Sequence, residues 1–256
     1  MIVEERRAKI VEMLKYQRAL KVSVLTQTFG VSVETIRRDL EFLENEGFLK
    51  RVYGGAIRKG VFGEEPAYDK REVINLDAKK AIAMEAAKLI ENGDTVFIDI
   101  GTTCLEVAKL LSDRKNLTVL TNSFMIAKEM TDFPGCRVFL LGGELRKGEL
   151  SVSGFLTSTN INLFNADKAI IGAGGVTLES GITDYHPEEA YVRRVMIDRS
   201  KYCVVVTDSS KFGVVAMNFV CPLEKIGVLV TDDSITEEMK LSLEAALIPF
   251  IVSSTK

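Results

Sequence analysis

The side chains best suited to chemistry in this sequence follow short apolar runs. Asp99 ends one such run, "TVFID", and is followed by Gly101, Thr102 and Thr103, where a helix is expected to begin. The free amides of a helix N-terminus, the helix dipole and two hydroxyl groups would then converge on one spot. This arrangement predicts a binding site for an anion, most simply a phosphate.

The same pattern recurs at later apolar runs. The residues that follow these runs are Thr121, Asn122 and Ser123, then Gly142 and Gly143, then the glycines of "IGAGGV", and finally Asp208, Ser210 and Lys211. We assign the amides, the hydroxyls and Lys211 to a phosphate, and Asp99 and Asp184 to sugar hydroxyls. The predicted ligand is therefore a phosphorylated polyhydroxy compound. The alternative is that Thr102, Thr103 and Ser123 only cap helices and that Lys211 is a surface lysine.

Other chemistries lack their sequence signals. The chain has no glycine-lysine loop for a nucleoside triphosphate and no GxGxxG fingerprint for a dinucleotide, so no cofactor is predicted. The four cysteines are scattered and His186 is the only histidine, which gives no zinc-type ligand set. An enzyme, specifically a sugar-phosphate isomerase or deaminase, stays open as an alternative. In that case Asp99, Asp184, Glu188 and Glu189 would supply the acids that move protons on a sugar.

These residues can meet only if the apolar runs form one sheet. Short β-prone segments alternate with amphipathic ones from residue 77 onward, which predicts a mostly parallel α/β sheet covered on both faces. Ligands of such sheets bind at the carboxyl ends of the strands. The expected strands are 95–99, 117–122, 137–143, 168–175, 202–208 and 226–232, and the expected helices are 77–93, capped by Asp77, and 102–111, 123–130, 187–200 and 236–247.

The first 58 residues predict a separate helical unit. Ile10, Val11 and Leu14 form one face of a first helix, and a second helix follows with Ser23 as its expected cap, Leu25 and Phe29 inward and Gly30 at its end. Ser32 is expected to cap a third helix, with Ile36, Leu40 and Leu43 as its buried stripe. Three helices with a tight turn before the last one indicate a helix-turn-helix.

A buried stripe at these positions turns the polar residues of the third helix outward. Arg38 lies opposite the stripe and Arg37 on its flank, where arginines can bond guanine in DNA. The segment "FLKRVYGGAIRK" predicts a hairpin with basic edges, a wing that can follow phosphates. The expected DNA-binding residues are Ser32, Glu34, Thr35, Arg37, Arg38, Lys50 and Arg51. The alternative is a protein-interaction module whose arginines pair with Glu34, Asp39 or Glu41.

Charge and composition agree with two units of different character. Residues 1–59 hold 12 Lys and Arg against 8 Asp and Glu, a net +4, and the remaining 21 against 28 give −7, so the sum is −3. The basic part is the one expected to meet DNA. With 46% hydrophobic and 27% charged residues, the 256-residue chain is typical of a globular protein. It shows no signal peptide and no membrane-length apolar run, so we expect a cytoplasmic protein.

We place the unit boundaries by composition. Residues 1–58 are the expected winged helix-turn-helix, and residues 59–76 mix glycine, proline and charge without a period, which is typical of a linker. Residues 77–256 are the expected effector-sensing α/β domain.

Two groups of motifs resemble a known family. The stretch "VSVETIRRDLEFLENEGFLKRVYGGA" closely resembles the winged N-terminal domain of DeoR-type bacterial transcription regulators. The motifs "DIGTT", "TNS", "LLGG" and "GITDYHPEEAYVRRVMIDRSKYCVVVTDSSKFG" resemble the C-terminal sensor domain of the same family. This resemblance implies a fold similar to ribose-5-phosphate isomerase and glucosamine-6-phosphate deaminase, and a phosphorylated sugar or related metabolite as inducer.

The resemblance also implies site residues and a mechanism. Matched motifs favour Asp99, Gly101, Thr102, Thr103, Thr121, Asn122, Ser123, Glu189 and Lys211 as effector contacts. Arg193 departs from the pattern, because a lysine is frequent at its position. The expected protein is a repressor of a carbohydrate operon that acts as a homo-oligomer on operator DNA and is released by a sugar phosphate. A scaffold that binds neither DNA nor phosphates is the remaining alternative.

Overall fold

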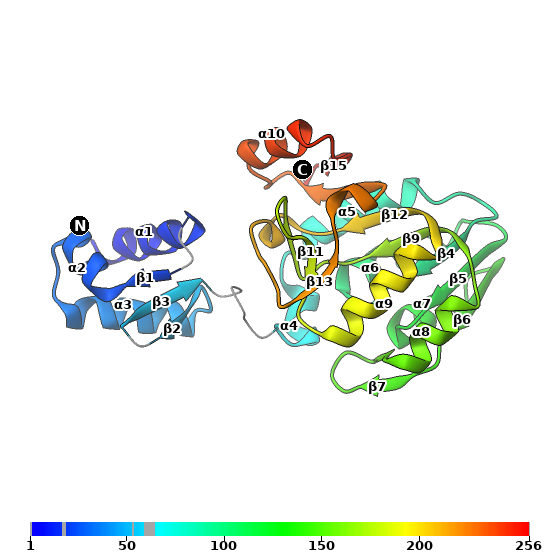
Figure 1. The fold of residues 1–256 in the computed structure, drawn as a ribbon, viewed down its shortest axis with the longest axis horizontal. Helices are drawn as coiled ribbons and strands as arrows, with labels where there is room; N and C mark the ends of the chain where they lie inside the picture. Colours follow the sequence, from blue (N-terminus) through cyan, green and yellow to red (C-terminus); the bar gives the residue numbers. More distant parts are fainter. Residues whose placement is uncertain (1, 17–18, 53, 59–64, 256) are drawn as a thin grey trace. The chain divides into compact units, whose positions relative to one another are not determined.

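The computed structural model describes residues 2–16, 19–52, 54–58 and 65–255. The chain divides into two compact units, residues 1–64 and 65–256, and each is a separate body (Figure 1). None of the described helices is both long and apolar enough to cross a membrane.

The first unit is a winged helix. Its elements are α1 (Val3–Tyr16), β1 (Ala19–Lys21), α2 (Val22–Phe29), α3 (Val33–Asn45), β2 (Leu49–Val52) and β3 (Gly55–Arg58). The three strands form an antiparallel sheet in the order β1-β3-β2, so the predicted hairpin of β2 and β3 gains a third strand. Ile10, Leu25, Ile36, Leu40 and Leu43 are all buried in one core, which confirms the predicted stripes of the three helices.

Two of the three predicted features at the ends of α2 and α3 are confirmed. Gly30 ends α2 in the left-handed conformation, at φ 63°, and the Ser32 hydroxyl caps α3 by accepting from the Thr35 amide at 3.1 Å. The predicted cap at Ser23 is wrong. Helix α2 begins one residue earlier because β1 runs directly into it, so Ser23 lies inside the helix and no side chain caps it.

The second unit is built on a seven-stranded parallel sheet. Its elements are α4 (Tyr68–Val73), α5 (Leu76–Lys88), β4 (Thr95–Ile98), α6 (Thr102–Lys109), β5 (Leu117–Thr121), α7 (Phe124–Met130), β6 (Cys136–Leu140), β7 (Glu144–Arg146), β8 (Ser151–Ser153), α8 (Phe155–Asn162), β9 (Ala166–Ile171), β10 (Gly175–Thr177), β11 (Gly181–Asp184), α9 (Pro187–Asp198), β12 (Ser200–Val206), the short 3-10 helices 209–211 and 223–225, β13 (Asn218–Cys221), β14 (Val228–Asp232), α10 (Glu237–Ala245) and β15 (Phe250–Ser253).

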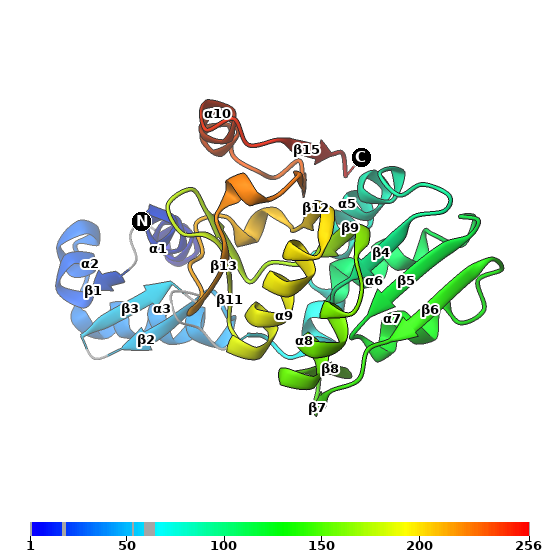
Figure 2. The same cartoon turned by 45° about the vertical axis from the view of Figure 1, so that its right-hand side comes forward.

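The strands of the main sheet run in the order β15-β14-β12-β9-β4-β5-β6, and every pair is parallel. Helices α5, α6 and α7 contribute to the core on one face, and α8, α9 and α10 to the core on the other (Figure 1 and Figure 2). The predicted mostly parallel sheet covered on both faces is therefore confirmed. Strand order brings the carboxyl ends of β4, β9 and β12 side by side at the centre of the sheet.

Several short elements carry no clear sequence period and were not predicted. They are α4, inside the stretch 59–76 assigned to the linker, α8, the hairpin of β7 and β8, the small antiparallel sheet β10-β11-β13, and the edge strand β15. The predicted cap at Asp77 is also wrong. Helix α5 begins at Leu76, and Asn75 precedes it in the left-handed conformation without a side-chain cap. The close succession of α4 and α5 moves the N-cap two residues ahead of the expected position, from Asp77 to Asn75.

Candidate functional site

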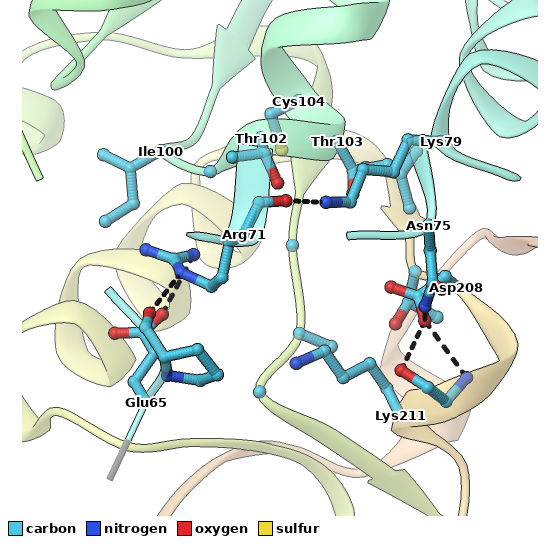
Figure 3. A pocket seen from close by; sticks show the side chains of 18 of the residues that line it. Glu65, Arg71, Asn75, Lys79, Ile100, Thr102, Thr103, Cys104, Asp208 and Lys211 are labelled. Carbon is cyan, nitrogen blue, oxygen red and sulfur yellow. Dashed lines mark hydrogen bonds and ion pairs between the residues drawn. The ribbon is translucent and has the colours of Figure 1, made fainter. Parts of the chain in front are cut away.

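A cavity of about 170 Å³ opens at the carboxyl ends of β4, β9 and β12 (Figure 3). Its walls come from the start of the second unit through α5, the start of α6, the loop after β9, the end of β11, and the loop after β12. An apolar cavity of about 150 Å³ is enough to hold a benzene molecule, so this space suits a small ring or chain. Of the twelve residues predicted to bind the effector, it includes Gly101, Thr102, Thr103, Asp184 and Lys211.

Helix α6 presents its N-terminus to the cavity, as the sequence predicts. Gly101 precedes the helix at φ 119°, a conformation that side chains rarely adopt, and no side chain caps the first turn. Thr102 is buried and Thr103 is partly exposed at the cavity wall. The amides of this first turn therefore keep their capacity to hold an anion.

Two lysines line the same cavity, and neither pairs with a carboxylate in the described parts of the chain. Lys79, from α5, is 4% exposed, and its ammonium group donates to the carbonyl oxygen of Arg71. Burial lowers the pKa of Lys79 to about 8, because a charged amine loses hydration there. Lys211 lies 6.0 Å from the ring centre of Tyr185. An anion in the cavity would be the natural partner for both charges.

Arg193 forms the floor of the cavity, and two carboxylates of the protein already pair with its charge. Its Nε donates to Asp99 Oδ2 at 2.5 Å and its Nη1 donates to Asp184. All three side chains are buried. Burial opposes the charge, but the carboxylates of Asp184 and Asp99 raise the pKa of Arg193 well above its ordinary value, so it remains a cation. Asp99, predicted to contact a sugar, lies beneath the cavity and positions Arg193 and the amide of Gly172.

A second ionic group borders the cavity near the start of the unit. Arg71, from α4, donates to the Pro66 carbonyl oxygen at 2.9 Å and pairs with Glu65 at 3.0 Å and with Glu149. Glu65 also lies 2.9 Å from Arg146 and 3.3 Å from His186 Nε2. Arg71 and Glu65 line the cavity. His186, the only histidine of the sequence, thus contacts an ionic network beside the cavity.

Thr121, Asn122 and Ser123 do not line this cavity. Strand β8 covers them: the Asn122 side chain donates to the Val152 carbonyl oxygen at 2.9 Å, and the Val152 amide donates to the Asn122 carbonyl oxygen. The Ser123 hydroxyl caps α7 by accepting from the Ile126 amide, and Thr121 accepts from the Ser123 amide. The structure therefore gives this strand end the cap role that the sequence left as its alternative.

Gly142, Gly143 and Glu189 also lie outside the residues that line the cavity. The Gly142 carbonyl oxygen accepts from Asn160, and a side chain at Gly143 would lie 1.9 Å from the Thr157 hydroxyl, so both serve packing against α8. Glu189 is buried and pairs with Arg146. Burial raises the pKa of Glu189 to about 7, against the opposing charges of Arg193 and Arg146.

Sequence reasoning missed Arg71, Asn75 and Lys79. Asn75 donates to Asp208 Oδ1 at 3.0 Å, which fixes the loop that carries Lys211. Arg71 and Asn75 fall in the predicted linker, where glycine, proline and charge hid the short helix α4, and Lys79 falls in the predicted helix that follows it. The charged run "DKREVINLDAKK" followed by alanines was the available signal, since it mixes helix formers with an apolar period.

The first unit presents the predicted DNA-binding residues at its surface. Arg37 and Arg38 are exposed on α3, and Arg38 lies 3.9 Å from Glu34 with both side chains mostly in solvent. Asp39, one of the partners in the alternative reading, is instead buried and holds Arg6 and Arg7 of α1 at 2.6 and 2.9 Å. Asp39 is therefore not the partner of Arg37 or Arg38, and both arginines stay exposed on the surface of α3.

The Glu44 side chain of α3 binds the wing. Glu44 accepts from the Arg51 amide at 2.7 Å and from Arg51 Nε at 2.6 Å, so Arg51 is held against the helix. Arg37 and Arg51 line one groove of this unit. The hydroxyls of Ser32 and Thr35 lie 2.9 Å apart at the exposed start of α3. The side chain of Lys50 lies outside the described part of the chain.

Metal chemistry finds no support in the described residues. No group of three or more His, Cys, Asp or Glu side chains among them is placed to hold a metal ion. The four cysteines are free thiols, and burial raises the pKa of Cys104, Cys203, Cys221 and Cys136.

Comparison with known proteins assigns both units. Residues 6–59 match the family described as DeoR-like helix-turn-helix domain, and residues 74–233 match the DeoR C terminal sensor domain. The chain is 40% identical over 230 residues to the transcriptional repressor AccR of Agrobacterium fabrum, covering 90% of this chain and 89% of that protein. It is 36% identical over 244 residues to the HTH-type transcriptional regulator YulB of Bacillus subtilis, covering 95% and 94%.

Among solved structures, the chain is similar to ribose 5-phosphate isomerase A from Methanocaldococcus jannaschii. The match has a TM-score of 0.40 and 18% identity, and it covers 54% of this chain and 55% of the isomerase.

Proposed function

Because the chain belongs to the DeoR family of transcriptional regulators, we propose that it is a repressor whose operator affinity is controlled by a phosphorylated sugar. Its relatives are named as regulators and repressors, so the isomerase or deaminase alternative is set aside. The DNA-binding unit would read base edges with the exposed start of α3 and follow phosphates with the wing.

The cavity of the second unit supplies the support for the ligand class. One end combines the uncapped start of α6 with Lys79, which donates to the Arg71 carbonyl oxygen, and Lys211, which lies over the Tyr185 ring; neither forms an ion pair with a carboxylate of the described residues. This end suits one phosphate group. The rest of the wall carries Asp208, whose carboxylate has oxygen lone pairs beyond its contacts with Asn75 and Ser210 that can accept from a sugar hydroxyl group. The juxtaposition of Lys79 with the start of α6 is the observation that carries the proposal.

The regulatory step follows from linkage. A ligand that prefers one arrangement of the second unit shifts the equilibrium between arrangements and so changes DNA affinity, typically by ~1 to 3 kcal/mol. One winged unit offers few base contacts, so we propose that a homo-oligomer binds two half-sites. The identity of the sugar would be set by contacts to its hydroxyl groups, and the operon by the base contacts of α3.

A thermal-shift screen tests this function. The purified chain is heated with a panel of sugar phosphates and with the unphosphorylated parent sugars. A ligand at about 100 times its Kd stabilises the folded state by about 2.7 kcal/mol. We expect a rise in Tm with one phosphorylated compound, no rise with its parent sugar, and loss of the rise in Lys79→Met. If the same compound raised the Tm of Lys79→Met as much as that of the unchanged protein, the assigned site would be contradicted.

A further inference from the structure

Glu65 occupies an unusual place for a residue of an anion-binding cavity. It is a carboxylate on the cavity wall, its side chain is only 12% exposed, and it takes up a guanidinium group of the same wall. The Glu65 Oε1 atom lies 3.0 Å from Arg71 Nη1, and Oε2 lies 2.9 Å from Arg146 Nη2. A carboxylate that bridges two arginines in this way resembles the anionic group that a ligand would bring.

We propose that Glu65 is an internal competitor for the ligand: an anion entering the cavity takes Arg71 from Glu65, and the loss of this ion pair loosens the start of the second unit. This inference rests on the proposed function, because it requires an anionic ligand in this cavity. It makes Glu65 a residue that limits ligand affinity and that reports occupancy of the site.

The contacts of Arg71 favour an exchange of partners. Arg71 holds the start of the unit twice, through the Glu65 carboxylate and through the Pro66 carbonyl oxygen at 2.9 Å. Its own carbonyl oxygen accepts from Lys79, so the backbone of Arg71 is tied to the cation expected to meet the phosphate. A phosphate offers charge-assisted, paired hydrogen bonds to a guanidinium group, as a carboxylate does. The Arg71 guanidinium group points toward Glu65 at the cavity wall (Figure 3), so an anion that enters the cavity can compete with Glu65 for it.

Glu65 has other partners, and these make the loss of its pair with Arg71 possible. Arg146 and His186 Nε2, at 2.9 and 3.3 Å, remain beside it when Arg71 turns away. Arg71 also keeps a second carboxylate, Glu149, which holds it at the edge of the cavity. Both Glu65 and Arg71 therefore keep a partner of opposite charge when the ion pair between them is lost.

The position of Glu65 in the chain gives the exchange a consequence. Glu65 is the first residue of the second unit, and residues 59–64 connect it to the DNA-binding unit. When Arg71 no longer holds Glu65 and Pro66, the point at which the connecting segment is anchored to the second unit shifts along the chain. The switch therefore links cavity occupancy to the segment that leads to the DNA-binding unit.

Inorganic phosphate is the probe, and its Kd is measured by calorimetry on the full chain. We expect Glu65→Gln to bind phosphate about 3- to 10-fold more tightly than the unchanged protein, because the competitor loses its charge. Glu72→Gln removes one charge from the exposed face of α4 and is the matched control, expected to leave the Kd within twofold. Equal or weaker binding by Glu65→Gln overturns the inference.

A double-mutant cycle separates a partner exchange from simple repulsion. Arg71→Gln should weaken phosphate binding, and adding Glu65→Gln to it should bring no further gain. If Glu65→Gln tightens binding equally with and without Arg71, repulsion alone acts and the exchange is excluded. Where Glu65→Gln fails to fold, as judged by circular dichroism, Glu65→Asp serves instead, since the shorter side chain cannot bridge both arginines.

Hydrogen exchange reports the release itself. Amides 67–74 should exchange faster when phosphate is added to the unchanged protein, and Glu65→Gln should show the fast rate without phosphate. Unchanged exchange at saturating phosphate overturns the release step while the proposed function stands. Failure of the unchanged protein and of every variant to bind phosphate would instead remove the anion site, and both proposals would fall together.

Discussion

Arg193 donates its Nε hydrogen to Asp99 at 2.5 Å, across 94 residues of sequence and inside the floor of the cavity. The two side chains are 6% and 1% exposed, and Asp184 pairs with the same guanidinium group. Asp99 is therefore committed to the protein, and it acts on a ligand only through the cation that it positions. These ion pairs give the cavity a buried floor in which the Arg193 charge is already taken up by protein carboxylates.

Removing that cation should destabilise the second unit strongly. Arg193→Met leaves two buried carboxylates without their partner, and breaking a buried ion pair typically costs ~3 to 5 kcal/mol. Urea unfolding followed by circular dichroism measures the loss. The exposed pair of Lys225 and Asp198 provides the control, since Lys225→Met should cost less than about 1 kcal/mol. Similar losses in the two variants would show that the buried floor contributes little.

The α3 cap gives a test in the first unit. Ser32→Ala removes the hydroxyl that accepts from Thr35 and should cost about 1 kcal/mol. Amides of α3 that exchange by opening of this unit should then exchange about 5-fold faster. Ser23→Ala is the matched control because Ser23 lies within α2 and caps nothing. A larger effect at Ser23 than at Ser32 would be inconsistent with the observed caps.

Lys79 predicts an unusual pH dependence for anion binding. Burial lowers the pKa of Lys79 from 10.5 to about 8, so the ammonium form is present below pH 8 and is lost as the pH rises through that value. Affinity for sulfate, whose own charge is constant in this range, should fall by up to about tenfold per pH unit above 8. Lys79→Arg stays charged and should not show the decline. A decline that persists in Lys79→Arg assigns it to another group.

Arg38 should discriminate between DNA sequences. An operator obtained by selection from random duplexes should lose ~1 to 3 kcal/mol of binding free energy in Arg38→Ala, with weaker preference over mismatched sites. Lys201→Ala, an exposed change in the second unit, controls for net charge. Should Arg38→Ala weaken every sequence equally, Arg38 would be a phosphate contact and not a base contact.

Local patterns in the sequence determined the longer helices, most strands of the main sheet and several of their ends. The spacing of Ile36, Leu40 and Leu43 predicts the buried face of α3, and Ser32 predicts its start, because both depend on residues within one or two helical turns. The run before Asp99 followed by "GTT" likewise predicts a strand and an open helix N-terminus. Periodicity depends on residues that are close in the sequence, so it can be recognised without knowledge of the fold.

The tertiary structure decided which of these ends form one site. The ends after β4, β9 and β12 meet because those strands are neighbours in the sheet, whereas β8 covers Thr121, Asn122 and Ser123. Packing of α4 and α5 beside α6 places Arg71 and Lys79 on the cavity wall, and no spacing in the sequence indicates that position. Strand order and ion pairs over long sequence separations depend on burial and charge across the whole unit. The polar residue types could therefore be read from the chain, but their partners were set by the fold.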